Sequence, residues 1–145
     1  MSRTVLFLCT GNYFRSRYAE VVFNARARAA GVDWAASSRG LAVERGVRNV
    51  GTMAIPALER LARLGIADPA LARRPAAVTR DELASATRII ALKEAEHRVL
   101  VVERWPDFTG RVEYWQVDDV DCCPAEVALE SIDRLVDELL TEARR

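Results

Sequence analysis

A cysteine and an arginine near the start of the chain are the residues best suited to chemistry. Cys9 offers a nucleophilic thiol, and Arg15 offers a planar guanidinium that can hold two phosphate oxygens at once. Ser16 follows directly and can donate a hydrogen bond to the sulfur. Between the cysteine and the arginine the sequence is Thr10-Gly11-Asn12-Tyr13-Phe14. This spacing predicts a loop that binds an oxyanion above a reactive thiol, and we expect Thr10, Gly11, Asn12, Tyr13, Phe14 and Ser16 to be its substrate-binding residues.

The loop has a predicted strand before it and a predicted helix after it. Residues 4–8 form a continuous apolar run, which is typical of a strand buried on both faces. Residues 16–30 then show helical periodicity until a glycine ends it. Backbone N–H groups at a helix N-terminus attract anions and stabilise a thiolate, so we expect Cys9 to be ionised at neutral pH. Gly11 and Asn12 suit the left-handed backbone that such a tight loop requires.

A second group of candidate catalytic residues follows the last predicted strand. It consists of three carboxylic acids, Asp118, Asp119 and Asp121. Hydrolysis of a phosphate ester needs a proton donor for the leaving group and then a base for the attacking water, and one carboxyl can do both. Neighbouring carboxyl groups favour one another's protonated form, as a donor at neutral pH requires. Asp121 can instead cap the following helix, and the residues alone leave the choice between Asp118 and Asp119 open.

The rest of the chain alternates strands with helices. Further strands are predicted at residues 32–37, 87–92 and 112–117. Further helices are predicted from Pro56 to Gly65, after a Thr79 and Glu82 capping box, over residues 94–105, and from Pro124 onward. This alternation predicts an α/β fold with a parallel sheet and helices on both faces. Ligands bind such folds beyond the carboxyl ends of the strands, which indicates the loops at 9–16, 38–51 and 118–123.

Composition narrows the class of protein. The chain has 145 residues, enough for one hydrophobic core, and we interpret residues 1–145 as a single domain. Half of the residues are hydrophobic, 29% are charged and the formal net charge is zero, so nothing indicates a nucleic-acid partner. The apolar run near the start is too short for a signal peptide or a membrane span, which predicts a cytoplasmic protein. Three cysteines in a reducing compartment are expected to be free thiols.

The segment from Cys9 to Ser16 resembles the phosphate-binding loop of the low-molecular-weight protein tyrosine phosphatases, Cys-x-Gly-Asn-x-x-Arg-Ser. Ser38-Arg39-Gly40 resembles the family's Ser-Ala-Gly, and residues 115–119 resemble the segment with its general acid. The resemblance implies a four-stranded parallel sheet, a cysteinyl-phosphate intermediate and no metal or other cofactor. It also implies that the substrate is a phosphotyrosine protein or a small aryl phosphate ester.

Some positions depart from the family's pattern. The resemblance favours Asp119 over Asp118 as general acid/base, although Val120 stands where the family has proline. Phe14 replaces a second loop cysteine that can trap the oxidised nucleophile as a disulfide. The tyrosines that often follow the acid and sandwich an aryl substrate are absent, so Tyr13 and Phe14 are the candidate aromatic wall.

Other polar residues have simpler interpretations. His97, the only histidine, lies on a predicted helix away from the three loops and is expected to be at the surface or half-buried. Arg73 and Arg74 are expected to be a solvated pair. Cys122 and Cys123 lie near the acids, where packing or helix capping is a simpler role than a disulfide with the nucleophile.

Two other functions fit part of the pattern. Thioredoxin-coupled arsenate reductases begin similarly with Cys-Thr-Gly-Asn but need two further cysteines to relay a disulfide, and none lies between Cys9 and Cys122. Adjacent cysteines such as Cys122 and Cys123 form a disulfide with each other poorly. Phe14 and Val120 also make a catalytically weak phosphate-binding protein conceivable. Phosphomonoester hydrolysis fits the residues best, whereas the oligomeric state has no signature in the sequence.

Overall fold

A computed structural model describes residues 3–119 and 123–144 of the chain. These residues form one four-stranded parallel sheet in the order β2-β1-β3-β4. The strands are β1 (Arg3–Cys9), β2 (Trp34–Gly40), β3 (Arg88–Ala91) and β4 (Val112–Tyr114). The register of β1 with β2 runs from Arg3 opposite Trp34 to Cys9 opposite Gly40. The carboxyl end of β1 therefore places Cys9 at the edge where ligands bind this type of sheet.

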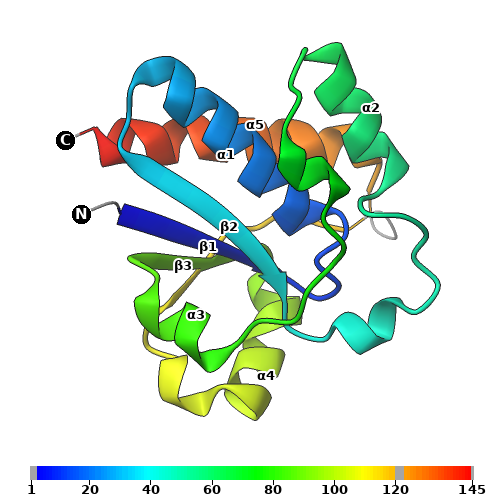
Figure 1. Ribbon diagram of the computed structural model, residues 1–145. Helices are drawn as coiled ribbons and strands as arrows, with labels where there is room; N and C mark the ends of the chain where they lie inside the picture. Colours follow the sequence, from blue (N-terminus) through cyan, green and yellow to red (C-terminus); the bar gives the residue numbers. More distant parts are fainter. Residues whose placement is uncertain (1–2, 120–122, 145) are drawn as a thin grey trace.

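Helices cover both faces of the sheet, as the sequence predicts. They are α1 (Arg15–Ala30), α2 (Ile55–Arg63), α3 (Arg80–Ser85), α4 (Glu94–Arg104) and α5 (Ala125–Ala143). Figure 1 shows α1 and α5 side by side on one face of the sheet and α3 and α4 on the other. Short 3-10 turns occur at Val43–Gly46, Pro69–Ala72 and Pro106–Phe108. The fold is thus a three-layer α/β domain.

The central strand supplies side chains to two separate cores. Val5 and Phe7 belong to the cluster beneath α1 and α5, whereas Leu6 and Leu8 belong to the cluster beneath α3 and α4. All four side chains are buried. Successive residues of a strand point to opposite faces, so an apolar run without polar alternation is what a strand covered on both sides needs.

The predicted helix boundaries agree with local capping chemistry. α1 and α2 are followed by Gly31 and Gly65, whose φ angles of 68° and 71° are left-handed. The capping box at the start of α3 is formed, because Thr79 Oγ1 accepts from the Glu82 N–H and the Glu82 side chain accepts from the Thr79 N–H. Glycine ends and a reciprocal cap are local features, which is why the sequence reveals them.

Two strands, β2 and β4, differ from their predicted ranges by more than one residue at an end. β2 begins at Trp34 rather than residue 32, because the Val32 N–H still donates to the Ala27 carbonyl at the end of α1. β2 also extends to Gly40, so Ser38, Arg39 and Gly40 lie in the strand and not in a loop. β4 ends at Tyr114, although hydrogen bonds from the N–H groups of residues 115 and 117 keep the following chain beside β3.

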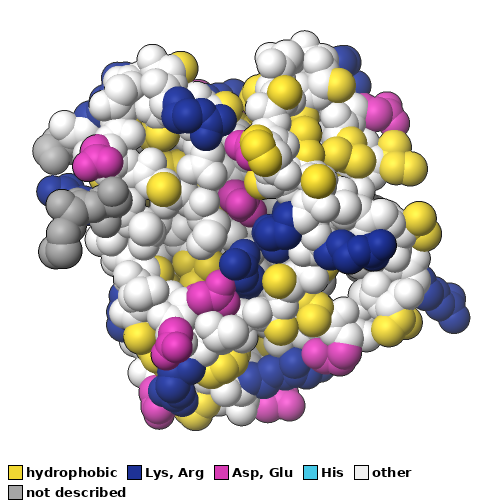
Figure 2. All heavy atoms as spheres, viewed as in Figure 1, with side chains coloured by type: hydrophobic (Ala, Val, Ile, Leu, Met, Phe, Trp, Pro, Cys, Tyr) yellow, Lys and Arg dark blue, Asp and Glu magenta, His cyan; other side chains and the backbone are white. Residues whose placement is uncertain are grey.

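The surface mixes both signs of charge. Figure 2 shows basic and acidic side chains interspersed over one face, with hydrophobic side chains gathered over α2. Ile55 begins this helix and Leu64 follows it, whereas Val47 and Val50 lie in the segment before it; all four are exposed. Among residues 3–119 and 123–144, no helix has the length and apolar character needed to cross a membrane.

Candidate active site

The carboxyl end of β1 opens into a cavity of about 180 Å³. Its lining residues are Cys9, Thr10, Gly11, Tyr13, Phe14, Arg15, Asn49, Ala54 and Asp119. The structure therefore brings the three predicted catalytic side chains to one cavity. Asn12 and Ser16, which the sequence assigned to substrate binding, are fully buried and do not line it.

The candidate nucleophile is one of the residues that line this cavity. Cys9 is 3% exposed, and its Sγ is 2.9 Å from Ser16 Oγ, the contact that the sequence predicts. α1 begins at Arg15, and no side chain among the described residues caps its N-terminus at Phe14. The first N–H groups of a helix need partners, so this end of α1 can bind an anion.

Arg15 is held rigidly at the wall of the cavity. Its side chain is 2% exposed, and Nη1 donates to the Val117 carbonyl at 3.0 Å. Nη2 donates to Glu96 at 2.7 Å and lies 3.5 Å from Asp119 Oδ2. Burial alone would lower the pKa of Arg15, but the carboxylate of Glu96 and the nearby Cys9 and Asp119 outweigh it and raise the pKa. Arg15 therefore keeps its charge.

Glu96 is a site residue that the sequence did not indicate. Its carboxylate accepts hydrogen bonds from Arg15 and from the Thr10 hydroxyl, the latter at 2.5 Å. Burial would raise the pKa of Glu96, but the contact with His97 and the hydrogen bonds from Arg15 and Thr10 hold it far below its usual range. The carboxylate is thus a fixed negative charge beside the loop. Only the fold makes it recognisable, because 81 residues separate it from Arg15.

The expectation for His97 is wrong. Its side chain is fully buried, and Nε2 lies 3.1 Å from Glu96 Oε2. Nδ1 accepts from the Lys93 N–H at 3.0 Å, which places the ring against the first turn of α4. Helical periodicity did not predict this burial, since it depends on how α4 packs beside the phosphate loop.

Two of the three predicted acids can be placed. Asp119 is 40% exposed and contributes to the cavity, whereas Asp118 forms an ion pair with Lys93. Val120, Asp121 and Cys122 lie outside the described residues. Cys123 is partly buried against the α1 and α5 core, with its N–H donating to the Asp119 carbonyl at 3.3 Å.

The two loop aromatics are placed differently. Tyr13 lines the cavity, and its hydroxyl donates to the Val50 carbonyl at 2.6 Å. Phe14 also reaches the cavity but is 6% exposed and belongs to the core. The Ala54 N–H donates to the Tyr13 carbonyl at 2.9 Å, which joins the loop to the segment before α2. Tyr13 is therefore the better candidate for an aromatic wall.

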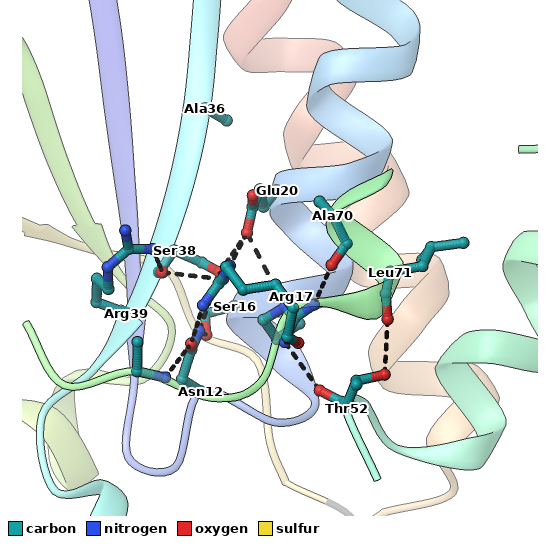
Figure 3. Close-up of polar contacts among 12 residues, drawn as sticks. Asn12, Ser16, Arg17, Glu20, Ala36, Ser38, Arg39, Thr52, Ala70 and Leu71 are labelled. Atoms are coloured by element: carbon teal, nitrogen blue, oxygen red, sulfur yellow. Dashed lines mark hydrogen bonds and ion pairs between the residues drawn. The ribbon is translucent and has the colours of Figure 1, made fainter. Parts of the chain in front are cut away.

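Asn12 gives the loop its sharp turn. Its φ of 51° is left-handed, which no other described non-glycine residue shares, and Gly11 does not adopt the positive φ that was expected. Asn12 Nδ2 donates to Ser16 Oγ at 3.0 Å and to Ser38 Oγ at 2.9 Å (Figure 3). Its Oδ1 accepts from the Ala76 N–H at 3.0 Å. Satisfied hydrogen bonds on both ends of the amide offset the strain of the left-handed backbone.

The end of β2 lies close to the same loop. A Cβ atom added at Gly40 would come 2.9 Å from the Thr10 carbonyl oxygen and 3.2 Å from the Asn12 Cβ. The N–H groups of Leu41 and Ala42 donate to the Cys9 and Thr10 carbonyls, both at 2.9 Å. A residue without a side chain is needed at position 40 for this approach.

The expectation for Arg73 is also wrong, whereas Arg74 is exposed as expected. Arg73 Nη1 donates to Asn12 Oδ1 at 3.2 Å, and Nη2 donates to Glu20 and to Ser38 Oγ, both at 3.1 Å. The arginine therefore reaches from a distant loop to the back of the phosphate loop. The sequence did not reveal these partners of Arg73, because they lie 35 to 61 residues away in the chain.

A family comparison agrees with this geometry. The sequence model for low molecular weight phosphotyrosine protein phosphatases matches residues 4–119. The chain belongs to this family. It is a cysteine-dependent phosphatase by family and fold, and the matched range extends from β1 to the acid pair. A comparison with curated protein sequences finds no match.

Solved structures share the fold over nearly the whole chain. A low molecular weight protein tyrosine phosphatase from T. tengcongensis is 27% identical, with a TM-score of 0.81, covering 97% of this chain and 99% of that one. YfkJ from Bacillus subtilis is 23% identical, with a TM-score of 0.83 and coverages of 99% and 96%. The YwlE arginine phosphatase from Geobacillus stearothermophilus is 24% identical, with a TM-score of 0.70 and coverages of 97% and 94%.

Proposed function

We propose that the protein hydrolyses phosphotyrosine in protein substrates through a cysteinyl-phosphate intermediate on Cys9. Arg15 binds the phosphate, and Asp119 serves as general acid and then general base. The observation that carries the proposal is the meeting of these three side chains in one cavity at the N-terminus of α1. A thiol, a fixed guanidinium and a carboxyl are the groups that a two-step phosphoryl transfer requires.

Each step balances with these residues. The Cys9 thiolate attacks phosphorus, the P–O bond to the leaving group breaks, and Asp119 gives its proton to the departing oxygen. Water then attacks the phosphocysteine, Asp119 takes a proton from that water, and the S–P bond breaks to restore the thiolate and release phosphate. Ser16, 2.9 Å from the sulfur, can donate a hydrogen bond to the thiolate and improve it as the leaving group.

The contacts of the two acids support Asp119 in this role. Asp118 is engaged by Lys93, whereas Asp119 faces the cavity and lies 3.5 Å from Arg15 Nη2. When Arg15 binds a phosphate group, that group competes for its positive charge, so the attraction between Arg15 and Asp119 weakens. A carboxyl beside a bound dianion favours its protonated form, as proton donation requires.

Tyr13 supports an aromatic leaving group, because its ring lines the cavity and its hydroxyl is anchored to the backbone of Val50. A second candidate substrate is protein phosphoarginine. Two of the similar structures are named arginine phosphatases. The ring of Tyr13 and the carboxylate of Asp119 in the same cavity are also able to contact a guanidinium. Parallel assays with matched phosphotyrosine and phosphoarginine peptides distinguish the two.

The deciding experiment is hydrolysis of an aryl phosphate by the wild type and by Cys9→Ser. We expect turnover only in the wild type and retained phosphate binding in Cys9→Ser, because Arg15 and the backbone hold the anion. Steady-state turnover by Cys9→Ser would refute the covalent step. Phosphate binding without turnover in the wild type would indicate the weak binding protein, and thioredoxin-dependent reduction of arsenate would indicate the reductase.

A further inference from the structure

A second arginine of α1, two residues after Arg15, is enclosed in the protein. Arg17 is fully buried. Its Nη1 donates to the Thr52 carbonyl at 2.8 Å and to the Arg73 carbonyl at 2.7 Å, and its Nη2 donates to the Ala70 carbonyl at 2.5 Å. Figure 3 shows this side chain extending from α1 to the Thr52 and Ala70 segments.

The environment of Arg17 does not favour its charge. Burial, followed by the proximity of Arg73, lowers the pKa of Arg17 to about 10, while Glu20, 4.0 Å from Nε, acts in the opposite direction. Nε itself is buried without a hydrogen-bond partner among the described residues. A buried, incompletely satisfied arginine is costly, and a simple packing role would be filled better by an apolar side chain. The guanidinium therefore needs another explanation.

The two segments that Arg17 binds both continue to the phosphate loop. Two residues after Thr52, the Ala54 N–H donates to the Tyr13 carbonyl at 2.9 Å. The other segment carries Arg73, whose guanidinium donates to Asn12 Oδ1 at 3.2 Å. Arg17 thus reaches the loop through two routes.

The loop has a specific need for this support. Asn12 is held in a left-handed conformation, and its amide donates to Ser16 Oγ at 3.0 Å. Ser16 Oγ is in turn 2.9 Å from Cys9 Sγ. A shift of the Asn12 amide would therefore move the hydroxyl that faces the nucleophile.

We infer that Arg17 is a positioning residue for the phosphate loop, which acts by fixing the Thr52 segment and the segment that presents Arg73 to Asn12. A lysine is a poor substitute, because its single nitrogen cannot reproduce the fork with which the guanidinium reaches three carbonyls. The inference rests on the proposed function only in requiring that the loop binds a phosphate group.

The test compares Arg17→Met with Arg26→Met, a matched change on the same helix. Arg26 binds Asp133 and Asp137 on α5, away from the cavity. For each protein we would measure the dissociation constant of inorganic phosphate by calorimetry and the rate of Cys9 alkylation by iodoacetamide at a mildly acidic pH. The thermal unfolding midpoint and the kcat and KM for an aryl phosphate complete the set.

We expect Arg17→Met to weaken phosphate binding and slow alkylation by about tenfold or more. We expect kcat/KM to fall by about 10²-fold, a loss that a displacement of catalytic groups by about 1 Å can cause. Arg17→Lys should restore only part of each loss. Arg26→Met should lower the unfolding midpoint and leave the other three quantities unchanged. An Arg17→Met protein that loses stability but keeps phosphate affinity, alkylation rate and kcat/KM would overturn the inference.

A second pair of variants covers the case in which Arg17→Met does not fold. Arg73→Met keeps the backbone carbonyl that Arg17 binds but removes the guanidinium that donates to Asn12. Arg74→Met is the control, because Arg74 is exposed. We expect losses of phosphate affinity and alkylation in Arg73→Met only, and equal behaviour of the two variants would overturn the inference. Because phosphate binding and alkylation do not require turnover, both remain measurable if the proposed function itself fails.

Discussion

The back of the phosphate loop and the mouth of its cavity are held in different ways. Behind the loop, Asn12, Ser16 and Ser38 are fully buried, and the Asn12 amide donates a hydrogen bond to each of the two serine hydroxyls. At the mouth, Asp119 is 40% exposed, and the Lys93 and Asp118 side chains that form the neighbouring ion pair are also partly exposed. Buried hydrogen bonds hold one geometry, whereas exposed ion pairs contribute little and rearrange readily.

This contrast matches the demands of the proposed reaction. The phosphate group is the same in every substrate, so its binding loop benefits from a preorganised geometry. Leaving groups differ in size and shape, and an acid on a less constrained segment can adapt to them. We therefore expect changes at the loop to affect all substrates equally and changes at the acid to depend on the leaving group.

Among variants that keep Cys9, the largest loss common to all substrates is expected at Arg15. Arg15→Lys keeps the charge but loses the two-pronged geometry, and we expect kcat/KM to fall by about 10³-fold or more, with little dependence on the leaving group. A series of aryl phosphates of graded leaving-group pKa would measure this. Near wild-type activity in Arg15→Lys would show that the cavity is not the active site.

A more selective effect, confined to poor leaving groups, is expected at Asp119. Asp119→Asn should lower kcat by about 10²–10⁴-fold for poor leaving groups, because they need a proton to depart. Activated aryl esters should lose less, and the basic limb of the pH profile should flatten as the acid is removed.

Asp118→Asn, at the position directly before Asp119, is the matched control. It breaks the ion pair with Lys93, so we expect a shift of the pH optimum without dependence on the leaving group. A leaving-group-dependent loss in Asp118→Asn but not in Asp119→Asn would exchange the roles of the two acids.

The smallest predicted effect concerns stability in acid and involves Glu96, which links the loop to α4. Its pKa in the folded protein lies below its ordinary value of 4.5, so the stabilisation it provides is present above about pH 4.5 and is lost as the pH falls below that value. On acidification, the unfolding free energy of Glu96→Gln should therefore decrease less than that of the wild type.

Urea unfolding at neutral and acidic pH measures this difference. Glu94→Gln is the matched control, because Glu94 lies on the same turn of α4 and pairs with exposed Arg98. Equal acid sensitivity of Glu96→Gln and the wild type would mean that the contacts with Arg15 and Thr10 do not stabilise the fold.

The same contrast explains what could be predicted from the sequence. The order of strands and helices, the capping box at Thr79 and the contact between Ser16 and Cys9 depend on neighbouring residues or on local periodicity, and all are confirmed. Arg73 and His97 were misplaced because their partners are distant in the chain or depend on how α4 packs. Sequence patterns reveal which residues form the loop, but the residues that hold it in place emerge only when the fold is known.

The covalent step on Cys9 can be tested by trapping its phosphocysteine intermediate. Asp119→Asn should accumulate the phosphoenzyme with an activated aryl ester, because the first step needs little acid while the second step lacks its base. We would quench this variant during turnover of a radiolabelled substrate and map the labelled peptide. We predict label on Cys9, and none on the same peptide in the Cys9→Ala, Asp119→Asn double variant, because alanine has no atom that can accept the phosphoryl group. Release of product with no label on Cys9 at any time would contradict it.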